Sequence, residues 1–269
     1  MNAGNDLINE ARERLIFALD VPDRKNAEKY VKQLQHSVGC FKVGLELFVK
    51  EGPDILKMIK ENSSADIFLD LKLHDIPATL SRALISAASH DVKYVTIHLE
   101  EGETLRKIPS EVKDAKLEVL AVTILTSISE EDLERFSIDY IRNKKRKRFN
   151  KSIENEESLG SGLSKLEEIV IERAIQAEVS DCAGVICSGE EVEQIKLYFG
   201  NNLKAIVPGI RPDWSQVGND DQSRITTPKQ AIDLGADLIV VGRPIRDAKD
   251  PKEAAGRILD EVSQSLKSK

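Results

Sequence analysis

The sequence has little of the material from which secreted and membrane-spanning proteins are built. Its three cysteines, Cys40, Cys182 and Cys187, cannot all pair with one another and show no metal-ligand spacing. Such sparse cysteine predicts a reducing, cytoplasmic environment. The start, MNAGNDLINEARERL, carries charges where a signal peptide needs an apolar run, and no apolar stretch approaches the ~20 residues of a membrane span. We therefore expect no contact with a membrane.

An excess of positive charge is also missing. The formal net charge of −7 and a pI near 5.4 argue against nucleic acid as a partner. One basic run, KKRKR at 144–148, is followed by acidic residues at 154, 156 and 157 and by Gly-Ser-Gly at 160–162. Mixed charge beside a small-residue hinge is typical of a solvated surface segment, and we interpret the run in that way.

Short apolar runs alternate with amphipathic segments along the whole chain. We expect eight strands, at 14–20, 40–44, 67–69, 94–98, 117–125, 184–187, 203–207 and 238–241. Strict alternation implies parallel strands with helical crossovers, so the fold class is α/β and the eight units close into a (β/α)8 TIM barrel. The alternative, an open doubly wound sheet, needs a glycine-rich turn after the first strand, where the sequence reads DVPDR.

The helices and the domain follow from the same pattern. Asp23 is the expected N-cap of a helix at 24–34, and a helix at 45–60 is expected to break near Gly52. About 55 residues separate Ser127 from the next strand, roughly twice what one helix needs. We therefore predict a single domain over 1–269 with a surface insertion at about 137–165.

The stretch DLKLHDIP at 70–77 carries the densest set of reactive side chains. Asp70 and Lys72 point the same way from a strand, and Asp75 lies close enough to turn back toward Lys72. A buried lysine flanked by carboxylates stays protonated, so it can donate a proton and stabilise an anion. An isolated motif of this kind is more often a set of surface salt bridges worth about 0–1 kcal/mol each. Its place at the end of a strand favours function.

Other polar residues gather at the same rim of the predicted barrel, where such folds build their active sites. They are Asp20, Lys42, Thr126, Arg211 and Arg243. Loops after the seventh and eighth strands commonly bind phosphate, and Gly242 beside Arg243 offers a close backbone and a forked guanidinium. Arg211 and Gln222 are placed to close over the same phosphate. The rim predicts a phosphorylated small-molecule substrate with a lysine acid at its opposite end.

Seven motifs, in the same order from about residue 14 to 247, resemble the orotidine 5′-phosphate decarboxylase family. They are FALD at 17–20, FKVG at 41–44, DLKLHDIP followed by Thr79, LTS at 125–127, PGIRP at 208–212, DQ at 221–222 and VGRP at 241–244. The resemblance implies decarboxylation of orotidine 5′-monophosphate to uridine 5′-monophosphate in pyrimidine biosynthesis, without a metal or any other cofactor.

The resemblance also implies a role for each matched residue. Lys72 would protonate C6 of the pyrimidine, Asp70 would face the departing carboxylate, and Lys42 and Asp75 would complete an alternating array. Members of the family form homodimers, so Asp75, Ile76 and Thr79 would complete the partner's site.

The remaining roles concern the rest of the substrate. Asp20 and Lys42 would hold the ribose hydroxyls, and Thr126 with Ser127 the pyrimidine edge. The 5′-phosphate would be held by Pro208, Arg211, Gln222, Gly242 and Arg243. Two features depart from the family: LEEG at 99–102 replaces a small, glycine-rich turn, and the insertion has no counterpart.

Three other functions compete with this one. Sugar-phosphate lyases resembling 3-keto-gulonate-6-phosphate decarboxylase or hexulose-phosphate synthase share Asp-x-Lys-x-x-Asp but use a divalent metal and carry a glutamate where this chain has Lys42. An ammonium there would repel a metal. A catalytically silent nucleotide-binding barrel is the second, and the intact acid–base groups argue against it. A chain that works bound to a phosphoribosyltransferase is the third.

Overall fold

Eight parallel strands close into one barrel, each paired with the next and the last paired with the first. The computed structural model describes residues 3–99, 107–128, 131, 163–215 and 224–267. The strands are β1 (Leu15–Ala18), β2 (Cys40–Gly44), β3 (Asp66–Leu73), β4 (Tyr94–His98), β5 (Glu118–Val122), β6 (Gly184–Ile186), β7 (Lys204–Val207) and β8 (Leu238–Val241). The predicted (β/α)8 architecture is confirmed.

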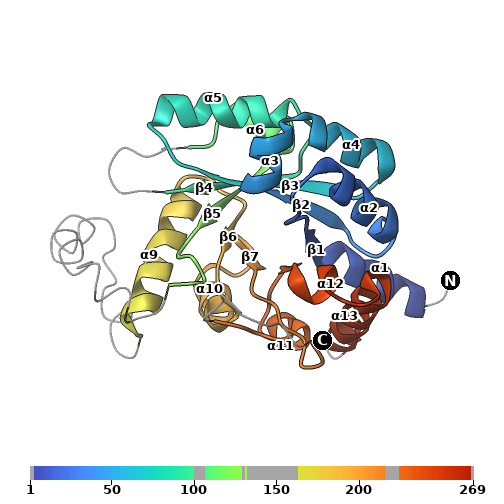
Figure 1. Ribbon diagram of the computed structural model, residues 1–269. Helices are drawn as coiled ribbons and strands as arrows, with labels where there is room; N and C mark the ends of the chain where they lie inside the picture. Colours follow the sequence, from blue (N-terminus) through green and yellow to red (C-terminus); the bar gives the residue numbers. More distant parts are fainter. Residues whose placement is uncertain (1–2, 100–106, 129–130, 132–162, 216–223, 268–269) are drawn as a thin grey trace.

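Helices surround these strands (Figure 1). Before β5 they are α1 (Ala3–Arg14), α2 (Arg24–Leu34), α3 (Leu45–Glu51), α4 (Asp54–Asn62), α5 (Pro77–Ala88) and α6 (Ser110–Asp114). After β5 they are α9 (Lys165–Val179), the 3-10 turn η1 (Gly189–Glu191), α10 (Val192–Phe199), α11 (Pro228–Asp233), α12 (Arg243–Arg246) and α13 (Pro251–Lys267). None of the helices within the described ranges has the length and apolar content that crossing a bilayer requires.

Two apolar clusters hold the barrel together. The larger one packs the outward face of the strands against the helices. The smaller one fills the barrel with alternate strand residues, among them Cys40 on β2 and Phe68 on β3. Because the same alternation continues along each strand, Lys42 and Asp70 point inward two residues further on, above this apolar floor.

Local sequence signals placed several elements correctly. Asp23 accepts a hydrogen bond from Asn26 N (2.8 Å) at the start of α2, as predicted for an N-cap. The expected break after α3 falls at Gly52, which adopts a φ of 63° that glycine tolerates. Ser164, within the bounds given for the insertion, opens α9 with a reciprocal capping box to Glu167. Residues 137–162 of the predicted insertion lie outside the described residues.

The strands and the first helix differ from the sequence-based expectation. β1 ends at Ala18 and β5 at Val122, and each is followed by one more backbone hydrogen bond to the next strand, from Leu19 N to Lys42 O (2.9 Å) and from Thr123 N to Ile186 O (3.2 Å). Helix α1 was not predicted, since only one face of this charged segment, with Ala11, is buried. It packs against α13, as Figure 1 also shows. Alanine, leucine, glutamate and arginine are strong helix formers, and they were the available signal.

Gly184 on β6 offers a test of how tightly the barrel is packed. An added Cβ would lie 2.5 Å from the backbone oxygen of Lys204 on β7, so Gly184→Ala is expected to destabilise the fold by about 2 kcal/mol. Gly256 is the matched control: it lies in α13 with open space around it, so Gly256→Ala should stabilise by about 0.5–1 kcal/mol. Urea unfolding of both variants measures the difference, and equal midpoints would contradict the packing argument.

Candidate active site

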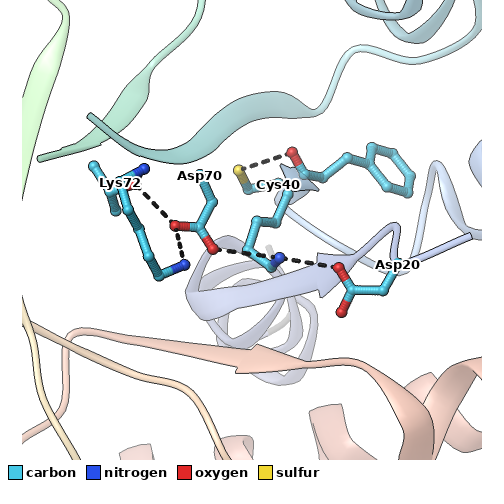
Figure 2. Close-up of polar contacts among 7 residues, drawn as sticks. Asp20, Cys40, Asp70 and Lys72 are labelled. Carbon is cyan, nitrogen blue, oxygen red and sulfur yellow. Dashed lines mark hydrogen bonds and ion pairs between the residues drawn. The ribbon is translucent and has the colours of Figure 1, made fainter. Parts of the chain in front are cut away.

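Four charged side chains of alternating sign form a row at the carboxyl ends of β1, β2 and β3. Lys42 Nζ lies 3.1 Å from Asp20 Oδ1 and 3.4 Å from Asp70 Oδ2. Lys72 Nζ donates to the other oxygen of Asp70 at 2.8 Å. Figure 2 shows the row running from Lys72 through Asp70 toward Asp20. The structure thus brings together four of the predicted residues from three consecutive strands.

The row is buried at its centre and open at its end. The side chains of Lys42 and Asp70 are 12% and 11% exposed, whereas that of Asp20 is 49% exposed. Burial would raise the pKa of Asp70, but the ammoniums of Lys42 and Lys72, with hydrogen bonds from Lys72 and Thr96, outweigh it and lower that pKa. Burial would lower the pKa of Lys42, and Asp70 and Asp20 instead raise it. Both groups are therefore held in their charged forms.

Lys72 has an unusual backbone conformation. Its φ is +49°, in the left-handed region that residues other than glycine enter at a cost of about 1–3 kcal/mol. The strand pairing explains where this happens: Leu69 pairs with Val95 and Leu73 with Ile97, so β3 spends four residue steps where β4 spends two. Lys72 lies inside this bulge. The Lys72 N–H then donates to the Thr96 hydroxyl (2.9 Å).

A cavity of about 510 Å³ opens above the row, within the size range of small-molecule sites. Ten of the predicted residues line it: Asp20, Lys42, Asp70, Lys72, Thr126, Ser127, Pro208, Arg211, Gly242 and Arg243. Apolar side chains, among them Val122, Ile124 and Val240, line it as well. The cavity therefore combines charged groups with an apolar wall that can exclude water from a bound ring.

The cationic side of the cavity comes from the loops after β7 and β8. The Arg211 backbone N–H donates to Thr226 O (2.9 Å), and Arg243 is the first residue of α12. Arg246, one turn further along α12, donates through Nη1 to the backbone oxygen of Asp20 (2.9 Å). Because β8 neighbours β1, this contact joins the cationic side to the end of the charged row. The cavity thus has guanidiniums on one side and a lysine paired with a carboxylate on another.

Three predicted residues lie apart from this cavity within the chain. Asp75 is exposed and accepts a hydrogen bond from its neighbour Ile76 N (2.7 Å). The expectation that Asp75 turns back toward Lys72 is wrong for a single chain: among the described residues, Lys72 Nζ pairs with Asp70. The side chain of Ile76 is exposed and Thr79 lies in the first turn of α5. Gln222 falls outside the described residues.

Other residues at the site were missed by sequence reasoning. Thr96 and Arg246 carry no motif of their own, although Arg246 follows the GRP motif closely. A buried ion pair between Arg224 and Glu191 lies behind the rim, where Arg224 also donates to the backbone oxygen of Leu125 (3.3 Å). This pair ties together the loops after β5, β6 and β7. The only sequence signal for this ion pair was a charged residue on each of two loops. The sequence alone does not show that these residues are buried.

Comparison with known proteins gives one consistent result. A model described as "Orotidine 5'-phosphate decarboxylase / HUMPS family" matches residues 13–258. The chain is 40% identical to an orotidine 5′-phosphate decarboxylase of Desulfosudis oleivorans, covering 95% of each protein. It is also 40% identical to that of Syntrophomonas wolfei, covering 95% of this chain and all of the relative. The crystal structure of the Lactobacillus acidophilus protein of that name has a TM-score of 0.68 at 31% identity, covering 92% of this chain and 98% of that one.

The lowered pKa of Asp70 predicts a pH-dependent contribution to stability. A folded-state pKa below the unfolded value means that ionised Asp70 stabilises the fold above pH ~4 and that this contribution is lost as the pH falls through the folded-state pKa. Asp70→Asn should therefore cost about 3 kcal/mol at pH 7, where it leaves Lys72 without its carboxylate and Lys42 with Asp20 alone, and less as the pH drops below about 4.

Asp91→Asn is the matched control for this experiment. Its carboxylate pairs with Lys60 at 2.7 Å but is 90% exposed, so the substitution should change the free energy of unfolding by less than about 0.5 kcal/mol at every pH. Urea unfolding of the three proteins between pH 3 and 8 gives the comparison. A gap for Asp70→Asn that does not vary with pH would contradict the predicted ionisation.

Proposed function

The chain belongs to the orotidine 5′-phosphate decarboxylase / HUMPS family, and from that membership we propose that it converts orotidine 5′-monophosphate to uridine 5′-monophosphate in pyrimidine biosynthesis. The observation that carries this proposal is the Asp70–Lys72 pair, 2.8 Å apart, in a cavity that Arg211 and Arg243 also line. The Asp70–Lys72 pair suits the carboxylate end of orotidine 5′-monophosphate, and the two arginines suit its phosphate end.

Lys72 supplies the chemistry at the pyrimidine. The bond between C6 and the carboxylate breaks, CO2 leaves, and the electron pair remains on C6. Since no adjacent group can delocalise that pair, a fixed ammonium must stabilise it by electrostatics. Lys72 Nζ, held 2.8 Å from Asp70, then gives its proton to C6 and regains one from solvent. Asp70 faces the substrate carboxylate and raises the energy of the bound ground state, which loss of CO2 relieves.

The opposite end of the substrate supplies binding energy. Arg211 and Arg243 with the backbone of Gly242 hold the phosphate, because forked guanidiniums match its oxygens. Asp20 and Lys42, 3.1 Å apart, hold the ribose hydroxyls, and Thr126 and Ser127 the pyrimidine edge. Contacts to these distant groups position C6 against Lys72, so part of the binding energy lowers the barrier at the reacting carbon.

The reaction proceeds without a metal in this proposal. The ammonium of Lys42 lies 3.4 Å from the Asp70 carboxylate, at the place where the sugar-phosphate branch carries a glutamate. A divalent cation beside Asp70 would meet this ammonium and be repelled. Lys42 therefore supports the decarboxylase over a metal-dependent sugar-phosphate lyase. The positive charge that the carbanion needs is supplied by Lys72 itself.

We propose further that the active unit is a homodimer. Asp75 is exposed, and Ile76 beside it is 66% exposed. On the neighbouring unit of the barrel, Leu45 and Val49 of α3 are 55% and 80% exposed. Large exposed apolar side chains next to an active site are typical of an interface. A second copy that covers them would bring its Asp75, Ile76 and Thr79 to the site of this one.

A cytoplasmic location fits the same function. Cys40, Cys182 and Cys187 are all free and buried. Burial raises the pKa of Cys182 and Cys187 to about 12, so both thiols stay protonated and unreactive at neutral pH. The fold thus makes no use of disulfides, as suits a reducing compartment.

The activity is tested by following the loss of orotidine 5′-monophosphate absorbance in excess chelator. We expect rapid turnover that Lys72→Ala reduces by about 10³-fold or more, because the acid is lost. Lys93→Ala is the matched control, since Lys93 pairs with Asp66 at 2.6 Å at the opposite end of β3 and should leave turnover unchanged. Turnover that needs added magnesium would contradict the mechanism, and no turnover by the wild type would overturn the function.

The dimer is tested by mixing two inactive variants. If Asp75 serves the partner, co-expressed Lys72→Ala and Asp75→Asn chains form hybrid dimers in which one of two sites is intact, which restores about 25% of wild-type turnover at random pairing. Lys72→Ala mixed with Asp70→Asn is the control and should restore nothing, because both residues come from the same subunit. Absence of recovery in the first mixture, with dimers present, would contradict a shared site.

A further inference from the structure

Thr96 on β4 contacts both reactive residues without lining the cavity itself. Its side chain is fully buried, and its hydroxyl donates to Asp70 Oδ1 at 2.8 Å. The hydroxyl oxygen of Thr96 accepts the backbone N–H of Lys72 at 2.9 Å. One hydroxyl therefore uses its single proton on the carboxylate and a lone pair on the backbone of the lysine.

The bulge in β3 makes this contact necessary. Regular pairing of β3 with β4 is interrupted between Leu69 and Leu73, so the ladder supplies no regular partner to the N–H of Lys72. Lys72 also holds a φ of +49°, which persists only where surrounding contacts fix it. The Thr96 hydroxyl is such a contact.

The same hydroxyl also orients the carboxylate of Asp70. Oδ1 of Asp70 receives both Thr96 Oγ1 and Lys72 Nζ, at 2.8 Å each, while Oδ2 faces Lys42 Nζ at 3.4 Å. With Oδ1 fixed from the β4 side, the plane of the carboxylate is set, and each oxygen meets one lysine. If the carboxylate of Asp70 could rotate, its two oxygens would no longer each face a fixed lysine.

We propose that Thr96 is a positioning residue for the decarboxylation: it locks the bulged backbone of Lys72 and the carboxylate of Asp70 in the geometry that proton transfer needs. This inference rests on the proposed function and deepens it. Thr96 touches no substrate atom and acts through Lys72 and Asp70. Loss of its hydroxyl therefore displaces the proton donor and leaves the phosphate and ribose contacts intact.

The test compares three substitutions at Thr96 with one elsewhere. Thr96→Val removes the hydroxyl at nearly constant volume, Thr96→Ser keeps it, and Thr96→Cys replaces it with a weak donor. Thr123→Val is the matched control, because Thr123 is equally buried and its hydroxyl donates to a backbone oxygen, that of Ile186 (2.8 Å). Thermal unfolding and circular dichroism establish that each variant folds.

Thr96→Val is expected to lower kcat about 30-fold with KM changed less than about threefold, since misplacing a reacting group by about 1 Å costs on the order of 10²-fold. Thr96→Ser should keep kcat within about threefold of wild type, and Thr123→Val should leave it unchanged. A wild-type kcat in Thr96→Val, or an equal loss in Thr123→Val, overturns the proposal. If Thr96→Val does not fold, the kcat of Thr96→Ser must be higher than that of Thr96→Cys.

A crystal structure of Thr96→Val, or of Thr96→Cys if valine prevents folding, separates this proposal from the proposed function. We expect Lys72 to leave the positive φ of +49° and its Nζ to move away from the 2.8 Å contact with Asp70. Unchanged Lys72 geometry overturns the positioning role, whatever the substrate is. A wild-type protein that does not turn over orotidine 5′-monophosphate overturns the function instead, and the crystal structure still decides the role of Thr96.

Discussion

The site depends on one carboxylate that is buried between two ammoniums. Asp70 meets Lys42 on one oxygen and Lys72 on the other, so neither lysine is left as an isolated buried charge. Removing the Asp70 carboxylate would leave the ammonium of Lys72 without this partner and that of Lys42 with Asp20 alone. The apolar floor below the row is compatible with this arrangement because the charges satisfy one another. Fixed charges of this kind need little reorganisation when a substrate's own charge changes, which is the basis of electrostatic catalysis.

The two groups of charged side chains come from different strands of the barrel. β1 to β3 carry the row of charges, and the loops after β7 and β8 carry the guanidiniums, with β1 next to β8 as the junction. Arg246 crosses this junction by donating to the backbone of Asp20, so the two groups are fixed relative to each other. Behind the rim, the pair of Arg224 and Glu191 joins the loops of the intervening strands. One contact to the backbone and one buried ion pair thus help to fix the distance between the two ends of the cavity.

Periodicity and motifs were enough to predict the barrel and most of the cavity lining, because strand alternation decides which side chains share a face. DLKLHDIP placed Asp70 and Lys72 in the cavity correctly, although Lys72 reaches it from a bulge that regular alternation does not predict. The same reasoning failed for Asp75, whose direction depends on the loop, and overlooked Thr96, whose role arises only because β3 bulges against β4. Arg246 was missed since a four-residue helix has no periodicity to detect. Long-range pairing, rather than composition, decides these cases.

Closure of the barrel has a consequence for the synthesis of the protein. β1, which leads to Asp20, pairs with β8, which leads to Arg243, and α1 packs against α13. The first strand must therefore wait on the ribosome until the last one emerges, with its edge unpaired on that side. Contacts this distant in sequence form slowly, and waiting edges are prone to misassociation. Because residues after β1 and after β8 line the same cavity, a chain that ends before β8 lacks part of the lining.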